Sequence, residues 1–235
     1  MELSKRLAAA AGMVTEGASV ADIGTDHGYV PIELVKKGVC KKGLAMDIGK
    51  GPLERAEAHI RSCRMEDQIT VRLSDGMDKL SPGEADRIVI AGMGGPLMAR
   101  ILTDGRDSAK AAGELILSPQ SELADFRRFL CEEGYVIREE VMLEEDGKYY
   151  VIFRVTNGEA DAYTDEAEVY TDAELAFGKV SRVRPDSLPV RKAWLDKEIG
   201  VCKSILQELE GKESETAARR REEVLRKLEV LRQVI

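Results

Sequence analysis

The sequence predicts an α/β fold in which a mostly parallel, seven-stranded sheet ends in an antiparallel hairpin and is followed by two helices. Three observations support this prediction. Apolar runs and segments of helical periodicity alternate over residues 3–132, and strands that alternate with helices form parallel sheets. Two β-rich segments around an Asp-Gly pair then suit a hairpin. Two apolar stripes at helical spacing end the chain.

The predicted elements follow one another in a regular order. Leu3, Leu7 and Ala10 recur at helical spacing, and Gly12 and Gly17 end this first helix. Short apolar runs then predict strands at 19–23, 43–47, 69–73, 87–91 and 115–117, followed by the hairpin strands 135–143 and 149–155. The helices between them are predicted at 31–37, 52–64, 96–103 and 122–132.

The chain divides into three predicted parts. Residues 1–157 form the α/β domain, and residues 158–190, which are polar and contain two prolines, form a linker or irregular crossing. Residues 191–235 form an antiparallel helical hairpin, a small coiled coil, that buries two apolar stripes. One stripe contains Trp194, Leu195, Ile199, Cys202, Leu206 and Leu209, and the other contains Val224, Leu225, Leu228, Leu231 and Ile235.

Composition and charge argue against several classes of function. With 43% hydrophobic and 33% charged residues and no membrane-length apolar run, we expect a cytoplasmic protein without a membrane partner. Two histidines and four scattered cysteines predict no metal site. The net charge of −8 argues against indiscriminate coating of nucleic acid, but residues 179–235 carry 14 Lys and Arg against 10 Asp and Glu. The oligomeric state stays open, with a monomer as the working hypothesis.

The segment from Ala21 to Pro31, which joins a strand to a helix, carries the strongest functional signal. Gly24 and Gly28 allow a tight turn and the close approach of a ligand, although a glycine turn alone can be purely structural. Asp22 and Asp26 place negative charge where a dinucleotide site presents backbone amides to a pyrophosphate. The loop therefore favours a cationic ligand, such as the ammonium and sulfonium groups of S-adenosylmethionine.

The ends of the next strands carry further candidates. Asp47 lies about twenty residues beyond the first glycine, where a carboxylate can accept hydrogen bonds from ribose hydroxyls. Asp75 could accept from an adenine amino group, and a structural Asp-Gly turn is the alternative. The segment 91–95 contains three glycines that leave a shallow wall for a flat substrate. Because this segment lacks an Asp/Asn-Pro-Pro-Tyr/Phe motif and the chain lacks a Pro-Cys motif, the usual exocyclic-amine and 5-methylcytosine mechanisms are disfavoured.

These segments resemble a known bacterial family, the tRNA (adenine(22)-N1)-methyltransferases. The resemblance covers nearly the whole chain and rests on Leu3-Ser4-Lys5-Arg6-Leu7, residues 22–31, Asp75-Gly76, Gly83-Glu84-Ala85-Asp86, residues 90–95 and Glu144-Glu145-Asp146-Gly147-Lys148. It implies a Rossmann-like class I methyltransferase domain with a coiled-coil C-terminal domain, S-adenosylmethionine as the cofactor and tRNA as the partner. An antiparallel final hairpin is characteristic of this fold. The chain departs from the family pattern at Leu117-Ser118-Pro119-Gln120, where Leu-Gln-Pro-Asn is common.

The resemblance and the residue chemistry together give the candidate site. Asp26 is the catalytic candidate. The cofactor-binding candidates are Asp22, Gly24, Thr25, His27, Gly28, Asp47, Ile48, Asp75, Gly76, Ala91, Gly92, Met93 and Gly94. The substrate-binding candidates are Tyr29, Gly95, Pro119, Gln120, Arg219 and Arg220. His27 could instead brace its loop, Tyr29 could be ordinary packing, and the two arginines could simply solvate a helix.

Adenine N1 has an in-plane lone pair, so its methylation requires positioning and electrostatic stabilisation rather than a general base. Asp26 could accept a hydrogen bond from the exocyclic amine of the target. Two alternatives stay open: a methyltransferase of the same fold that acts on a protein or small molecule, and a non-catalytic S-adenosylmethionine-binding protein that interacts with RNA.

Overall fold

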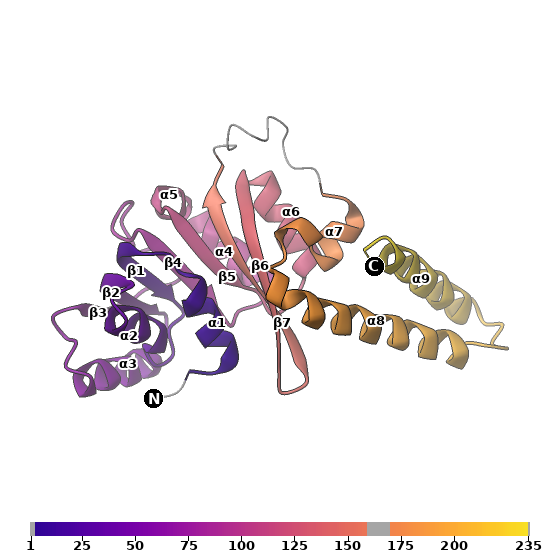
Figure 1. Ribbon diagram of the computed structural model, residues 1–235, viewed down its shortest axis with the longest axis horizontal. Coiled ribbons are helices and arrows are strands. Elements are labelled where there is room, and N and C mark those ends of the chain that lie inside the picture. The colour runs from indigo at the N-terminus through magenta and orange to yellow at the C-terminus, as the bar shows by residue number, and fades with distance from the viewer. Residues whose placement is uncertain (1–2, 159–169, 235) are drawn as a thin grey trace.

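The computed structural model describes residues 3–158 and 170–234, and its centre is one seven-stranded sheet (Figure 1). The strands are β1 (Gly17–Ile23), β2 (Cys40–Asp47), β3 (Ile69–Leu73), β4 (Arg87–Ala91), β5 (Glu114–Ser118), β6 (Tyr135–Glu145) and β7 (Lys148–Asn157). Their order is β3-β2-β1-β4-β5-β7-β6, with β1 to β5 parallel and β7 antiparallel to both neighbours. The predicted fold class is confirmed.

Helices cover both faces of the sheet. One face carries α1 (Lys5–Met13), α2 (Tyr29–Lys36) and α3 (Lys50–Ser62), and the other carries α4 (Gly95–Asp104), α5 (Arg106–Ala111) and α6 (Leu123–Glu132). Successive strand residues point to opposite faces, so Ile88 and Ile90 pack in the core beside α4 and α6 while Val89 packs beside α1 and α2. The protein therefore has an apolar core on each face of the sheet, and its central strands are buried on both sides.

The predicted boundaries of the α/β part are close to the observed ones, and the differences are mostly strands that are longer than predicted. β1 and β2 begin two and three residues earlier, and β5 gains one residue at each end. β6 and β7 are longer because the hairpin pairs as far as Glu145 and Lys148 around the turn residues Asp146 and Gly147. Both turn residues have positive φ, as a tight two-residue hairpin turn requires. Helix α5 was not predicted, since its six residues are too short to show helical periodicity.

Part of the segment predicted as a linker, residues 158–190, folds against the sheet. Residues 159–169 lie outside the described residues, and after them come α7 (Asp172–Phe177), the short 3-10 turns Val180–Arg182 and Pro185–Ser187, and the start of α8 (Leu188–Glu208). The Arg127 guanidinium, fully buried, donates to both oxygens of Glu140 at 3.1 and 2.7 Å and to the Leu175 carbonyl at 2.7 Å. This buried pair fastens α7 to α6 and β6.

Helices α8 and α9 (Glu215–Arg232) form an antiparallel hairpin that extends away from the sheet (Figure 1). Arg191 is buried at its base, where it donates to the carbonyls of Phe177, Gly178 and Val234. The two predicted apolar stripes meet in one core, except that Leu209 is not part of it, Leu225 is exposed and Ile235 lies outside the described residues. The coiled-coil description and the three-part division of the chain stay predictions.

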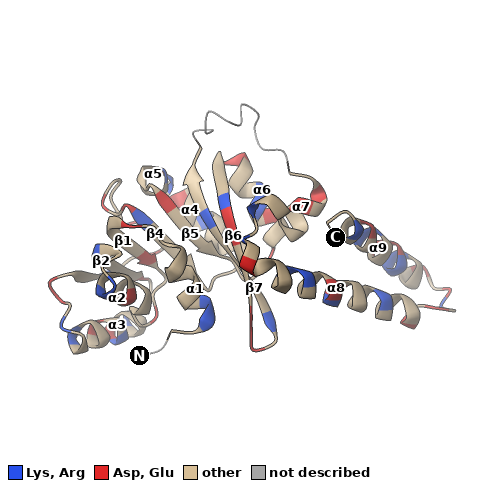
Figure 2. Cartoon of the chain, in the orientation of Figure 1, with Lys and Arg blue, Asp and Glu red and all other residues tan. Residues whose placement is uncertain are grey.

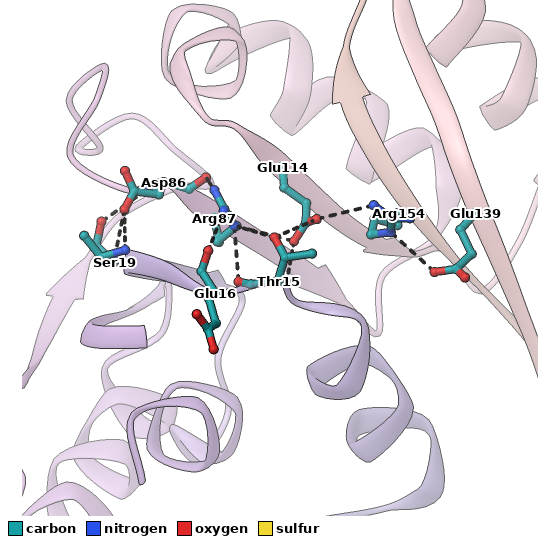
Figure 3. Close-up of polar contacts among 9 residues, drawn as sticks. Thr15, Glu16, Ser19, Asp86, Arg87, Glu114, Glu139 and Arg154 are labelled. Atoms are coloured by element: carbon teal, nitrogen blue, oxygen red, sulfur yellow. Dashed lines mark hydrogen bonds and ion pairs between the residues drawn. The ribbon is translucent and has the colours of Figure 1, made fainter. Parts of the chain in front are cut away.

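A polar network holds the amino-terminal edge of the sheet (Figure 3). Asp86 accepts from the backbone N–H groups of Ala18 and Ser19 at 2.6 and 3.0 Å. Glu114 accepts from the backbone N–H of Thr15 at 2.9 Å and lies 3.7 Å from the Arg87 guanidinium. The Gly83–Asp86 motif therefore has a structural role at this edge, on the opposite side of the sheet from the candidate site.

Candidate active site

The loop after β1 is a rigid cradle at the carboxyl end of the sheet. Gly24 and Gly28 have φ values of +78° and +67°, which favour glycine. The backbone N–H groups of Gly24 and Thr25 donate to the Met46 carbonyl at 2.8 and 2.9 Å, and the Gly28 N–H donates to the Thr25 hydroxyl at 3.1 Å. These bonds anchor the loop to β2, so its turn does not depend on a ligand.

Asp22 is a buried carboxyl group at the base of this loop. Only 6% of the residue is exposed. The pKa of Asp22 is raised from 3.8 to about 6, mainly because the carboxyl group is buried; a hydrogen bond with Thr25 opposes the change, and the negative charge of Asp47 adds to it. A positive charge beside Asp22 would favour its ionised form, so the cradle is chemically suited to a cationic ligand.

Asp26 lies at the surface of the same loop and already has two partners. Its carboxylate is bound by the Arg55 guanidinium of α3 and lies 3.2 Å from His27 Nε2. The hydrogen bond from Arg55 is the main reason that the pKa of Asp26 is lowered. Asp26 is therefore an ionised acceptor that is already engaged by Arg55. Arg55 was not predicted as a site residue, because nothing in the sequence of its helix indicates the distant loop that it contacts.

Three aromatic rings stack beside Asp26. The Tyr29 ring lies 4.9 Å from that of His27 and 5.2 Å from that of His59, with interplanar angles of 7° and 19°. His59 Nδ1 lies 3.1 Å from the His27 carbonyl oxygen. His59 is half-buried in this stack, and Tyr29 packs against two rings.

The ends of β2 and β3 place the next candidates at the same edge. Asp47 accepts from the Gly49 N–H at 2.6 Å, and Ile48 beside it is 67% exposed. Asp75 pairs with Arg100 of α4 at 3.2 Å. Gly76 has a φ of +51°, and a Cβ there would lie 3.0 Å from Ile101. Asp47 thus borders the cradle, whereas Asp75 is tied to the helix that follows β4.

The loops after β4 and β5 pack together to form the other wall. The Gly92 N–H donates to the Ser118 carbonyl at 3.4 Å, and the Gln120 N–H donates to the Met93 carbonyl at 2.9 Å. A Cβ on Gly94 would lie 2.9 Å from the Ser121 hydroxyl oxygen, and a Cβ on Gly95 would lie 2.7 Å from the Ser121 carbonyl oxygen. These glycines are required for the close approach of the two loops. Ala91 and Gly92 precede them at the end of β4, and Pro119 is buried beside them.

Met93 joins the two walls. Its terminal methyl group occupies the space that a Cβ on Gly24 would need, so the loops after β1 and β4 are in contact. Three buried polar atoms near these loops have no hydrogen-bond partner among the described residues: His27 Nδ1, Ser118 Oγ and Arg6 Nη1. Buried polar groups are normally satisfied. Asp22 suits a positively charged group of a ligand, whereas these unsatisfied atoms suit its polar groups, and Arg6, which is itself a cation, suits an oxyanion.

Arg219 and Arg220 are not brought to this edge. They lie in the first two turns of α9, and α9 begins at the end of the helical hairpin that is far from the sheet (Figure 1). Both pair with Glu223, at 3.4 and 3.1 Å. Lys and Arg alternate with Asp and Glu along both helices (Figure 2), so this surface has mixed charge.

No three His, Cys, Asp or Glu side chains in residues 3–158 and 170–234 are grouped as a metal site would require. In the same part of the chain, none of the helices combines the length and hydrophobicity of a membrane span.

Comparisons with known proteins agree with this arrangement. A family model described as "Methyltransferase domain" matches residues 3–153. The tRNA (adenine(22)-N(1))-methyltransferase of Bacillus subtilis is 33% identical over 236 residues, which cover 100% of this chain and 98% of the relative. The crystal structure of the B. subtilis m1A22 tRNA methyltransferase superposes with a TM-score of 0.79 and 32% identity, covering 100% of this chain and 99% of the other.

A second solved structure contains the methyl donor. It is that of a candidate tRNA (m1A22) methyltransferase from Streptococcus pneumoniae in complex with S-adenosyl-L-methionine, with a TM-score of 0.82, 30% identity and 99% coverage of both chains. The matches extend through the C-terminal helices, because they cover the whole length of both chains. The chain is therefore a methyltransferase-domain protein and belongs to the bacterial tRNA (adenine(22)-N1)-methyltransferase family.

Proposed function

We propose that this protein transfers a methyl group from S-adenosylmethionine to N1 of adenosine 22 in tRNA. The observation that supports this most strongly is the buried Asp22 in a glycine cradle at the carboxyl edge of the sheet, in a chain that aligns over its full length with an enzyme of that activity. In open α/β sheets, ligands bind at this edge. Because the proposed substrate is tRNA, we expect the enzyme to act in the cytoplasm.

The residues around the cradle have distinct roles in donor binding under this proposal. S-adenosylmethionine supplies an electrophilic methyl group on a positively charged sulfur. Asp22 provides a negative charge beneath it, and Gly24, Thr25 and Gly28 allow the backbone to approach closely. Asp47 accepts from the ribose hydroxyls, with Ile48 against the adenine. Asp75 and Gly76 border the adenine, and His27 contributes its unpartnered Nδ1.

The acceptor nitrogen does not need to be deprotonated by a general base. N1 of adenine carries a lone pair, so the protein must align it with the methyl group and stabilise the positive charge that the purine acquires. We propose that Asp26 does the latter by exchanging Arg55 for the exocyclic amine. Its lowered pKa keeps it ionised and therefore able to accept that hydrogen bond at neutral pH.

The target base must leave its stack before N1 is accessible. We propose that the loop wall formed by Ala91 to Gly95, Pro119 and Gln120 receives the flat purine, with Tyr29 at its border, and that Ala91, Gly92, Met93 and Gly94 also border the donor. Arg219 and Arg220 are proposed to contact phosphates elsewhere on the tRNA, in competition with Glu223.

The experiment that tests this function offers labelled donor separately to total tRNA and to protein extract. Transfer to tRNA is expected, and transfer only to protein would refute the proposal in favour of another acceptor. The Asp26→Ala variant should keep its fold and bind the donor while losing most methyl transfer. If wild-type protein bound the donor but methylated neither pool, a non-catalytic RNA-interaction role would replace the enzymatic one.

A further inference from the structure

Arg6 lies in the first turn of α1, and its guanidinium reaches the acceptor side of the candidate site. The Arg6 backbone N–H donates to Glu145 at 3.4 Å, which ties the helix to the β6–β7 hairpin. The guanidinium carbon lies 5.6 Å from the centroid of the Tyr150 ring. Both terminal nitrogens lie 3.6 Å from the position of a Cβ on Gly92, and the Gln120 amide nitrogen lies 3.9 Å from the same position.

Within residues 3–158 and 170–234, the Arg6 guanidinium has no anionic partner. Arg6 Nη1 is buried and has no hydrogen-bond partner among the residues that the structure describes. Buried charges in proteins are normally paired and buried donors normally satisfied. Arginine presents a planar fork of donors that matches the geometry of a carboxylate or phosphate. The side chain is therefore positioned by Tyr150 and the hairpin but left with donor capacity for an oxyanion.

The neighbours of the guanidinium indicate which oxyanion it binds. Gly92 and Gln120 belong to the loops after β4 and β5, which form the proposed acceptor wall, and Tyr150 lies in β7. The donor cradle belongs instead to β1 and β2. A contact with the reacting edge of the base is disfavoured, because methylation at N1 makes the purine positive and a guanidinium there would oppose that charge. A phosphate next to the target base is an anion on the acceptor side, and it lies away from the reacting edge of the base.

We propose that Arg6 binds a backbone phosphate of the tRNA beside the extruded target adenosine and so positions that nucleotide. This inference rests on the proposed function and deepens it. It also gives a role to the Leu3–Leu7 segment, which the sequence singled out without assigning it a task. The phosphate contact would come from the catalytic edge itself, independently of the distant arginines of α9.

The test compares Arg6→Gln and Arg6→Lys with wild type and with Arg64→Gln, an exposed arginine at the end of α3. For each protein, kcat and KM for tRNA are measured at saturating donor, and tRNA and donor affinities are measured directly. Arg6→Gln is expected to raise KM and Kd for tRNA about tenfold, with donor affinity unchanged, because a charge-assisted contact is lost. Its tRNA affinity should also lose about one unit of salt-dependence slope.

The other variants and outcomes make the test decisive. Arg6→Lys should recover part of the tRNA affinity, since it keeps the charge but not the fork, and Arg64→Gln should match wild type. Weaker donor binding with unchanged tRNA affinity would assign Arg6 to the donor carboxylate and overturn the proposal. Unchanged values for both ligands would overturn it as well. If wild-type protein failed to methylate tRNA, the proposed function would fail, whereas wild-type activity with an unaffected Arg6→Gln variant would refute only the role of Arg6.

Discussion

Donor binding should depend on pH through Asp22. In the free protein the pKa of Asp22 is about 6 because the carboxyl group is buried. A bound cation favours the ionised form, and if it returns the pKa to about 4, ligand binding releases a proton below pH 6. A change of about 2 units then makes donor affinity about tenfold weaker at pH 5 than at pH 7.5, and about a hundredfold weaker in the limit.

Calorimetric titration with S-adenosylmethionine between pH 5 and pH 7.5 measures this effect. Asp22→Asn should bind the donor more weakly at pH 7.5 and show a smaller pH dependence, whereas Asp67→Asn, an exposed control, should follow wild type. Identical pH profiles for wild type and Asp22→Asn would refute the reasoning.

The stability of the free protein should also depend on pH through Asp22, but in the opposite direction: it falls as pH rises, whereas donor affinity increases. A carboxyl group whose pKa is raised on folding leaves the folded state with more bound protons than the unfolded state between pH 4 and pH 6. The free energy of unfolding contributed by Asp22 therefore falls as pH rises through this window, by about 3 kcal/mol for about 2 units. Asp22→Asn should consequently be more stable than wild type at pH 7, because it removes a buried negative charge that is kept for ligand binding at a cost in stability.

Three further predictions concern other parts of the molecule. Arg127→Leu should lower the free energy of unfolding by about 3–5 kcal/mol in urea titrations, because it leaves Glu140 buried and uncompensated; a change below about 1 kcal/mol would contradict this. Gly95→Ala should reduce kcat/KM at least about tenfold, since its Cβ would lie 2.7 Å from a backbone oxygen, while Gly200→Ala, with open space around it, should keep full activity. Glu223→Gln should lower KM for tRNA a few-fold by freeing two arginines, and an unchanged KM would exclude them from the tRNA-binding surface.

The strands of the sheet could be predicted from the sequence because buried strands appear as short local runs of apolar residues. The runs at 87–91 and 69–73 coincide with β4 and β3. β4 is a central strand whose residues Ile88, Val89 and Ile90 are fully buried. β3 lies at the edge of the sheet and is only partly buried, and its β-branched residues Ile69, Thr70 and Val71 are typical of a strand. The polar segment after β7 was harder to interpret. Thr171 and Glu174 form a capping box at the start of α7, and this signal could have revealed the helix.

The site was predictable where it follows from strand ends and not where it follows from distant contacts. Asp22 and Asp47 lie at the carboxyl edge because parallel strands end there. Arg55, His59 and Arg6 reach the same edge from helices whose own sequences do not indicate their partners. Such contacts depend on how helices pack on the sheet, which no local pattern encodes.

The most direct test of the account is to map the methylated position. Unmodified tRNA with adenosine or guanosine at position 22 is incubated with the protein and labelled S-adenosylmethionine, and the nucleosides are then identified and placed in the sequence. The account predicts N1-methyladenosine at position 22 of the first tRNA and no label in the second. Label at another position, equal label in both tRNAs, or none in either would contradict it.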